Sequence, residues 1–291
     1  KISNAAIVIK MKSTVQRSGR WMCCSAFSSV PAVHQSIAGR TRFYKNVNVA
    51  ATPDGLKYNV TLDGRVLKTP ARNPLDLPNI DLAMAIALEW DAQNEKSRGI
   101  QPVNMPMMSL ASTAIDQVAL HPPTVIETCM KYLPTDAGLF IAPDHDRILL
   151  AKQKEYLFPV LEWYKDKLKL DLGVTQSMAS RITHSDEVMN RIEGIISKMD
   201  HFTLTCLQGA VLESKSLVLA LAYIARHMTM DDMLVASRLE EEFQVEIWGV
   251  VEGGHDMDRL NNAVRISSVG TFMSLHYDNK QLEQKWTEWT K

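Results

Sequence analysis

Acidic and histidine side chains cluster near residue 255, and this cluster is the best candidate in the sequence for metal chemistry. Its members follow Gly249 and are Glu252, His255, Asp256 and Asp258. Carboxylate oxygens and imidazole nitrogens are ligands for divalent metal ions, but neighbours in a loop after a helix more often cap it or pair with one another. We therefore assign no metal ligand here. A metal-dependent enzyme using Glu252, His255 and Asp256 is the least favoured alternative.

Asp136, in the segment YLPTDAG, is the other candidate for acid–base chemistry. A carboxyl group can act as a general acid or base, yet Thr-Asp before a helix is commonly a cap for the free N–H groups of that helix. We predict a structural role for Asp136. The sequence has no GxGxxG, GxxxxGKS/T, HExxH or GxSxG motif, so it lacks the usual phosphate, zinc and nucleophile signatures. We expect no catalytic residue, no metal and no cofactor.

A long helix should position the acids that precede this loop. Thr229 and Asp232 have the spacing of a capping box, so we predict that a helix begins at Thr229 and runs to Trp248, where Gly249 ends it. Within this helix apolar residues recur at every fourth position, namely Val235, Leu239, Phe243 and Ile247. They form one face, and we expect them to anchor the helix in a core.

Three consecutive acids, Glu240, Glu241 and Glu242, interrupt this apolar helix. Successive helical positions differ by about 100°, so the three side chains point in different directions and cannot all face water equally. Glu240 should lie at the Ile247 edge of the apolar face, with Gln244 beside it. On residue type alone, a solvated acidic face is the favoured interpretation.

The first 43 residues have the composition of a targeting segment. Residues 1–53 contain no Asp or Glu but eight Lys or Arg residues, and they are rich in Ser and Ala. This pattern is typical of mitochondrial or plastid transit peptides; an ordinary disordered tail is the alternative. We predict a transit peptide over residues 1–43, disordered or cleaved near Phe43–Tyr44.

Composition excludes several classes of protein. Without residues 1–43 the chain has 25 basic and 33 acidic residues, a formal charge of about −8, whereas nucleic-acid binding needs clustered Lys and Arg. The longest apolar run, Leu217–Ala225, is half what a bilayer span needs. Cys129 and Cys206 form no CxxC motif, which favours a reducing compartment and no structural zinc. We expect no nucleic-acid partner and no membrane span.

Strand signals dominate residues 44–78. Tyr58–Leu62 alternates apolar and polar residues and runs into Asp63-Gly64, a strong hairpin signal. Val47–Ala50 should pair with the same strand across an Asp54-Gly55 turn. We also expect a short strand at Leu75–Leu77.

Helical periodicity follows, from Asp81 to about Arg98. Leu82, Ile86 and Trp90 share one face, so Trp90 should be a core residue, while Glu89 should reach water.

Prolines divide the rest of the first domain. Pro102 and Pro106 argue against a helix before Ser109–Val118. Pro122-Pro123 then breaks the chain, and we place the end of an α+β domain, residues 44–121, at this point.

Residues 122–291 show helical signals and no convincing strand. The expected helices are Thr124–Tyr132, Arg147–Leu168, Asp186–Asp200, Thr203–His227, Thr229–Trp248 and about Asp258–Val269. Strands confined to the first part and helices to the second predict an α+β fold, in which a small antiparallel sheet with helices is followed by an all-α helical bundle.

Five blocks of sequence together resemble the mitochondrial ATP synthase F1 assembly factor 2 family, chaperones of the ATP synthase α subunit. In order, the blocks are YNVTLDGRVLKTP (58–70), LEW (88–90), MPMMSLASTAIDQV (105–118), YLPTD (132–136) and LExxFQxxxWGxxExxHD (239–256). The likeness covers about Phe43 to Tyr277. It departs from the family at Leu157-Phe158-Pro159, where Trp-Asp-Pro is frequent, and in the charged tail after Tyr277.

The resemblance implies a non-enzyme: an assembly chaperone of the mitochondrial matrix that binds the unassembled α subunit, prevents its aggregation and releases it into the α/β hexamer. It also implies an orthogonal C-terminal bundle, and we expect a monomer when the protein is free. The functional glutamate of the family falls on Glu240 and its structural tryptophan on Trp90. A non-catalytic structural subunit of a large mitochondrial complex is the main alternative.

The predicted site has two groups of residues. Partner-binding roles are expected for Glu240, Glu241, Glu242, Gln244, Glu252 and Asp256. Structural roles are expected for Trp90, Asp136, Trp248 and Gly249, with both tryptophans packed in the core.

Overall fold

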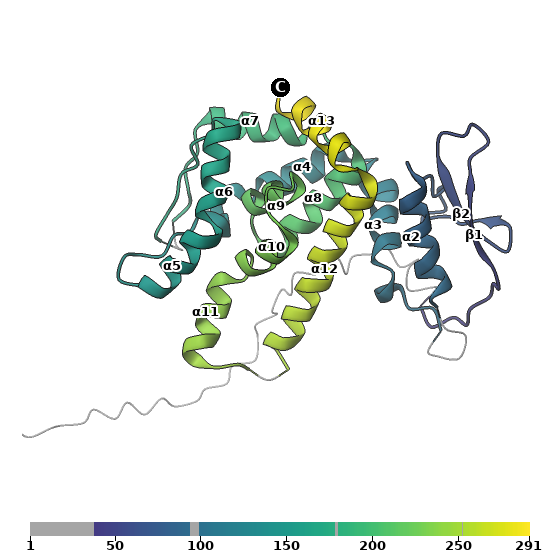
Figure 1. Ribbon diagram of the computed structural model, residues 1–291, viewed down its shortest axis with the longest axis horizontal. Coiled ribbons are helices and arrows are strands. Elements are labelled where there is room, and N and C mark those ends of the chain that lie inside the picture. The colour runs from purple at the N-terminus through teal and green to yellow at the C-terminus, as the bar shows by residue number, and fades with distance from the viewer. Residues whose placement is uncertain (1–37, 94–98, 178–179, 252) are drawn as a thin grey trace, which may run out of the picture. The chain divides into compact units, whose positions relative to one another are not determined.

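The described chain opens with an antiparallel sheet of three strands in the order β1-β2-β3 (Figure 1). The computed structural model describes residues 38–93, 99–177, 180–251 and 253–291, which all belong to the unit Pro31–Lys291. Strand β1 (Val47–Ala51) pairs with β2 (Tyr58–Leu62), which pairs in turn with β3 (Arg65–Val66). Both predicted hairpins are therefore confirmed.

The turn between β2 and β3 has the backbone that its sequence predicts. Asp63 has a φ of 48° and Gly64 a φ of 80°, and two successive positive φ angles belong to the tight turns that suit the twist of a hairpin. The predicted strand at Leu75–Leu77 is wrong, because the segment forms only an isolated bridge. The carbonyl of its first residue accepts a hydrogen bond from the Asn59 side chain at 3.0 Å.

Helix α2 (Ile80–Asp91) packs against β1 and β2. The predicted inner face of Leu82, Ile86 and Trp90 is confirmed, since all three side chains are buried. The helix ends at Asp91 instead of near Arg98, and residues 94–98 lie outside the described residues.

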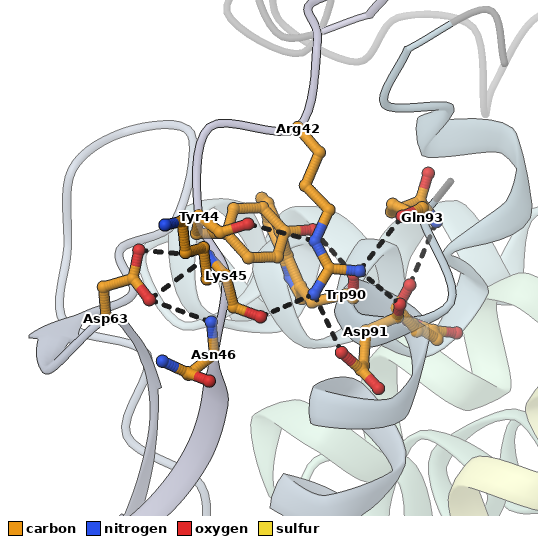
Figure 2. Close-up of polar contacts among 9 residues, drawn as sticks. Arg42, Tyr44, Lys45, Asn46, Asp63, Trp90, Asp91 and Gln93 are labelled. Carbon is orange, nitrogen blue, oxygen red and sulfur yellow. Dashed lines mark hydrogen bonds and ion pairs between the residues drawn. The ribbon is translucent and has the colours of Figure 1, made fainter. Parts of the chain in front are cut away.

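Arg42 occupies the C-terminal end of α2 (Figure 2). Its guanidinium donates hydrogen bonds to the carbonyl oxygens of Asp91 at 2.7 Å and of Gln93 at 3.2 Å, and to the Asp91 carboxylate at 2.9 Å. A cation at this end satisfies free carbonyl groups and opposes the negative pole of the helix dipole. The same group also donates to the backbone oxygens of Tyr44 and Lys45, so it joins two segments that are distant in sequence.

The folded unit therefore begins before the predicted boundary at residue 43. Besides the contacts of Arg42, the Gly39 N–H donates to the Ile100 carbonyl at 2.9 Å, and the Tyr44 hydroxyl donates to the Trp90 carbonyl at 2.6 Å. Residues 38–43 of the predicted transit peptide thus belong to the fold. Residues 1–37 lie outside the described residues, and a transit peptide there stays a prediction.

Helix α3 (Pro106–Thr113) continues into the π-helical turn η2 (Ala114–Val118), after a short 3₁₀ turn η1 (Pro102–Asn104). The prediction that Pro106 excludes a helix before Ser109 is wrong, because proline is tolerated at the first helical position, where no N–H partner is needed.

Glu89 caps the N-terminus of α3. The prediction that its side chain simply reaches water is therefore wrong. Its carboxylate accepts hydrogen bonds from the backbone N–H groups of Met107 at 2.7 Å and Met108 at 2.8 Å. Burial raises the pKa of Glu89 to about 7, against the opposing effect of these two hydrogen bonds.

The rest of the described chain is helical, so the fold is α+β, as predicted. The helices are α4 (Pro122–Met130), α5 (Arg147–Tyr156), α6 (Phe158–Trp163), α7 (Asp186–Ile196), α8 (His201–Ser214), α9 (Leu217–Ile224), α10 (Met230–Ala236), α11 (Leu239–Trp248), α12 (His255–His276) and α13 (Asn279–Thr290), with the short turns η3 (Leu133–Thr135), η4 (Ala137–Leu139) and η5 (Tyr164–Leu168). Every residue of α9 is buried, and most of α8 is too. These two helices form the centre of the helical region, where α8 packs against α9 and α12.

Two of the predicted long helices are interrupted. The predicted helix Thr203–His227 divides at Lys215, whose φ of 57° cannot continue a right-handed helix. The predicted helix Arg147–Leu168 divides at Leu157, because Pro159 lies in the first turn of α6 and has no N–H to donate to the preceding turn.

Other helix ends shift for reasons of capping. Helix α4 begins at Pro122, two residues before the predicted start, and α7 ends at Ile196 because Asp200 caps α8 by accepting the N–H groups of its first turn. Helix α13 was not predicted, although Asp278 and Gln281 form a capping box at its start.

Asn79 joins the sheet-containing region to the helical region. Its Oδ1 accepts from the Leu82 N–H at 2.9 Å and so caps α2. Its Nδ2 donates to the carbonyl oxygens of Leu275 at 2.9 Å and His276 at 3.0 Å, the last residues of α12. One amide side chain thus satisfies free backbone groups at the start of one helix and at the end of another. Residues 44–121 and 122–291, which we propose as two domains, share this contact.

Candidate functional site

The predicted helix Thr229–Trp248 is two helices, α10 and α11. Its predicted start is confirmed, because Thr229 and Asp232 form the capping box. Helix α10 then ends at Ala236, and the Ser237 hydroxyl donates to the Leu234 carbonyl at 3.1 Å, which replaces the continuing backbone hydrogen bond. A new helix begins after this break.

The break changes which side chains of α11 face inward. Leu239 and Val245 are buried, whereas Ile247 is 56% and Trp248 is 77% exposed. Val235 on α10 is also exposed. The prediction that Val235 and Ile247 anchor the helix is wrong, and so is the prediction that Trp248 packs in the core, because both predictions assumed one unbroken helix. The predicted end at Gly249 is confirmed, with a φ of 87° that favours glycine.

The first turn of α11 borders a cavity of about 280 Å³. Its other walls come from the end of α8, the start of η4 and the inner side of α5. The side chains around it include Phe140, Gln153, Leu157, Lys215 and Leu239, together with Glu240, Glu241 and Gln244. The cavity therefore brings together three of the predicted partner-binding residues, on walls that mix apolar and polar groups.

Glu240 is the acid of this cavity that has no partner among the described residues. Among the described residues, no hydrogen bond or ion pair involves its side chain. It is half-buried, and this burial raises its pKa above the usual value for glutamate. A carboxylate that is partly removed from water without a compensating donor is poised to accept a hydrogen bond or a cation from another molecule.

Glu241 and Glu242 differ from Glu240 because both are paired within the chain. Glu241 forms an ion pair with Arg238 at 2.5 Å. Glu242 accepts from Arg238 at 3.3 Å and from the Arg259 Nε at 2.8 Å, so it ties α11 to α12. The hydrogen bonds and charge of Arg259 and Arg238 hold the pKa of Glu242 below its usual value. Arg238 precedes these acids by three and four residues, the spacing of ion pairs on one helix, so its pairing could be predicted from the sequence. No sequence pattern predicts the pairing of Glu242 with Arg259.

Asp256, another acid of the prediction, is not among the residues around the cavity. The Asp256 carboxylate is largely exposed and lies 3.8 Å from Arg259, and Glu252 lies outside the described residues. Within the part of the chain that the structure describes, no three His, Cys, Asp or Glu side chains are arranged to hold a metal ion.

Asp136 directly precedes Ala137, one of the residues around the cavity. Its carboxylate accepts hydrogen bonds from the backbone N–H groups of Leu217 at 2.7 Å, Val218 at 3.0 Å and Gly138 at 2.9 Å. It is almost fully buried, and this burial raises its pKa to about 6, opposed by these hydrogen bonds and by one with Ser216. The structure thus shows Asp136 as a cap, but chiefly of α9, a helix that begins far away in the sequence.

Across the described ranges, no helix is long and apolar enough to cross a lipid bilayer. The half-buried Glu240 and the mixture of polar and apolar side chains around the cavity suit recognition of another molecule.

Comparison with known proteins adds independent evidence. The family described as ATP12 chaperone protein matches residues 41–165. The crystal structure of Atp12 from Paracoccus denitrificans is 30% identical, covers 81% of this chain and 98% of its own, and superposes with a TM-score of 0.74. The mitochondrial protein atp12 of Schizosaccharomyces pombe is 29% identical over 239 residues, covering 78% of this chain and 81% of its own length. The mitochondrial protein ATP12 of Saccharomyces cerevisiae is 24% identical over 275 residues, covering 79% of this chain and 83% of its own length.

The similarity extends over the α+β region and the helical region alike, and the match to a solved structure reaches nearly its full length. The chain belongs to the ATP12 chaperone family.

Proposed function

We propose that this protein binds the unassembled α subunit of mitochondrial ATP synthase in the matrix, keeps it from aggregating and releases it into the α/β hexamer. Membership of the ATP12 family makes chaperoning in ATP synthase assembly the general role. The α subunit as client, the matrix location, the monomeric free state and the absence of catalysis are the specific parts of the proposal.

The observation that carries the proposal is the half-buried carboxylate of Glu240 beside a cavity on α11, which has no partner within the described ranges. An unassembled subunit exposes apolar interface that aggregates unless it is covered. A chaperone must cover such a surface reversibly, so a few charges that orient the client are as useful as apolar area. Glu240 supplies such a charge, with Glu241 and Gln244 beside it; Glu242, Glu252 and Asp256 complete the proposed partner-binding group.

Co-expression with the ATP synthase α subunit tests this proposal. The wild-type protein should keep the α subunit in the soluble fraction. Glu240→Lys should abolish this effect, because it places a cation where the client supplies one. Glu193→Lys on α7 is the matched control. It makes the same charge change on an exposed side chain that is not among the residues around the cavity.

Thermal melts decide between a binding role and a structural role. We expect both variants to melt within about 2 °C of the wild type, because Glu193 is exposed and Glu240 has no hydrogen bond or ion pair with the described residues that the substitution would break. A melt of Glu240→Lys that falls by many degrees contradicts the proposal. Co-purification of the wild type with assembled complex instead of free α subunit supports the alternative of a structural subunit.

A further inference from the structure

Seven large apolar side chains are exposed around the connection between α11 and α12. They are Ile247, Trp248, Val250, Val251, Met257, Leu260 and Val264, each between 48% and 77% exposed. We call them the hairpin surface. Figure 1 shows α11 and the N-terminal half of α12 running toward the same end, where the connection joins them. Such a gathering of exposed apolar residues is unusual for the surface of a monomer and typically marks an interaction site.

The apolar residues of α12 share one face of that helix. Met257, Leu260 and Val264 are spaced by three and four positions, which places them above one another along the helix. Asn262 points the other way, is buried, and lies 3.5 Å from the Ser237 hydroxyl. Packing of α12 against α10 therefore holds the apolar face outward.

Two ion pairs link the helices that carry the hairpin surface to each other and to α5. Glu242 on α11 binds Arg259 on α12, and Glu246 on α11 binds Lys152 on α5. The first pair joins the two helices of the hairpin, and the second joins α11 to α5. Both pairs are partly exposed, so each contributes modestly to holding the helices. The apolar side chains are thus presented on helices whose orientation is set by their other faces.

Negative charge surrounds this surface. Six acids lie among the described residues from 239 to 264: Glu240, Glu241, Glu242, Glu246, Asp256 and Asp258. Three basic side chains, Arg238, Arg259 and Lys152, pair with acids of this group, which leaves a net charge of −3. An apolar centre with an acidic border complements an apolar protein surface bordered by Lys and Arg. A second copy of this chain fits poorly, because it would bring two acidic borders together.

We propose that the hairpin surface is a docking site for the chaperone's client, specifically for an apolar patch of the client flanked by basic residues, and that it acts together with the Glu240 cavity. This inference rests on the proposed function. It adds the surface that supplies most of the apolar contact area, whereas Glu240 supplies orientation.

A matched pair of triple variants tests the inference in the full chain. The test variant is Trp248→Ser, Met257→Ser and Leu260→Ser. The control variant is Leu56→Ser, Val103→Ser and Leu120→Ser, which removes apolar side chains that are 63% to 81% exposed outside the hairpin. Binding to the ATP synthase α subunit is measured at low and high salt, with circular-dichroism melts and size-exclusion chromatography of each protein.

We expect the test variant to bind the α subunit at least about tenfold more weakly, a typical result for removing buried interface anchors, and the control to bind within about twofold of wild type. Binding of the wild type should weaken as salt rises. If the test variant melts early, Leu260→Glu alone replaces it, with the same expectation.

Three results overturn the inference. The first is a test variant that binds as tightly as the wild type while Glu240→Lys does not bind, which leaves the proposed function intact. The second is a wild-type dimer that the test variant abolishes, which makes the surface a self-interface. The third is a wild type that does not bind the α subunit at all, which also ends the proposed function.

Discussion

The Asp136 carboxylate lies 2.7 Å from the backbone nitrogen of Leu217, a residue 81 positions further along the chain. Asp136 is buried and also accepts a hydrogen bond from the next N–H of α9. The N-terminus of the most buried helix of the described chain is thus capped by a side chain that is distant in sequence. This contact holds η4 against the start of α9, beside the cavity that Glu240 borders.

Replacing Asp136 should destabilise the fold strongly. Asp136→Ala leaves three buried N–H groups without an acceptor, and each costs about 1–3 kcal/mol, so we expect a loss of at least about 3 kcal/mol in the free energy of unfolding. Asp136→Asn keeps one acceptor oxygen and should lose less. Urea titrations measure both, with Asp186→Ala on the exposed first turn of α7 as a control. A loss below about 1 kcal/mol for Asp136→Ala contradicts the capping role.

Stability should depend on pH through the same residue. Burial raises the pKa of Asp136 from 3.8 to about 6, so between these values the folded protein binds more protons than the unfolded chain. The free energy of unfolding should therefore fall as pH rises through this window, by up to about 1.4 kcal/mol per pH unit from this group. The difference between wild type and Asp136→Asn, measured by urea titration from pH 4 to pH 7, isolates the effect. A difference that does not change with pH would show that the carboxyl group is not perturbed.

Arg42 should be needed for full stability, although it lies within the predicted transit peptide. Arg42→Ala removes hydrogen bonds to the end of α2, and we expect a loss of about 1–3 kcal/mol. A protein that starts at residue 38 should accordingly melt at a higher temperature than one that starts at Tyr44. Equal melting temperatures would show that residues 38–43 contribute little. Arg65→Ala, at an exposed position of β3, is the control.

The ion pair between Glu242 and Arg259 should couple α11 to α12 only modestly. Both side chains are about one-third exposed, 32% and 37%, and exposed pairs contribute about 0.2–1 kcal/mol. A double-mutant cycle with Glu242→Gln and Arg259→Gln should give a coupling energy in this range. A coupling near zero would mean that other contacts hold the hairpin. Hydrogen exchange of α11 should increase in either variant.

Elements defined by local patterns could be predicted from the sequence. The hairpin around Asp63-Gly64 and the inner face of α2 follow from turn chemistry and from helical spacing, and the structure confirms both. Capping at Thr229 was equally visible, because both partners lie within four residues. Such features need no information from the rest of the fold.

Features that depend on distant residues could not be predicted. The break after Ala236 left Trp248 exposed, and nothing in the apolar pattern distinguishes two helices from one. Glu89 looked solvent-facing because its position on α2 is polar, but its partners are the first N–H groups of another helix. Within the predicted site, the family resemblance pointed to Glu240, whose role stays a proposal. Its lack of a partner among the described residues and the pairing of Glu242 with Arg259 depend on contacts between separate helices, which the sequence does not reveal.

Asn79 has a consequence for how the chain acquires its structure. Its side chain completes the start of α2 and the end of α12 in one step, across nearly two hundred residues. During synthesis from the N-terminus, the sheet and α2 can form early, but the hydrogen bonds of Asn79 to the end of α12 cannot form until His276 has been synthesised. Completion of the N-terminal region is then a late event in folding, and a chaperone cut short before α12 would have neither these hydrogen bonds nor its hairpin surface.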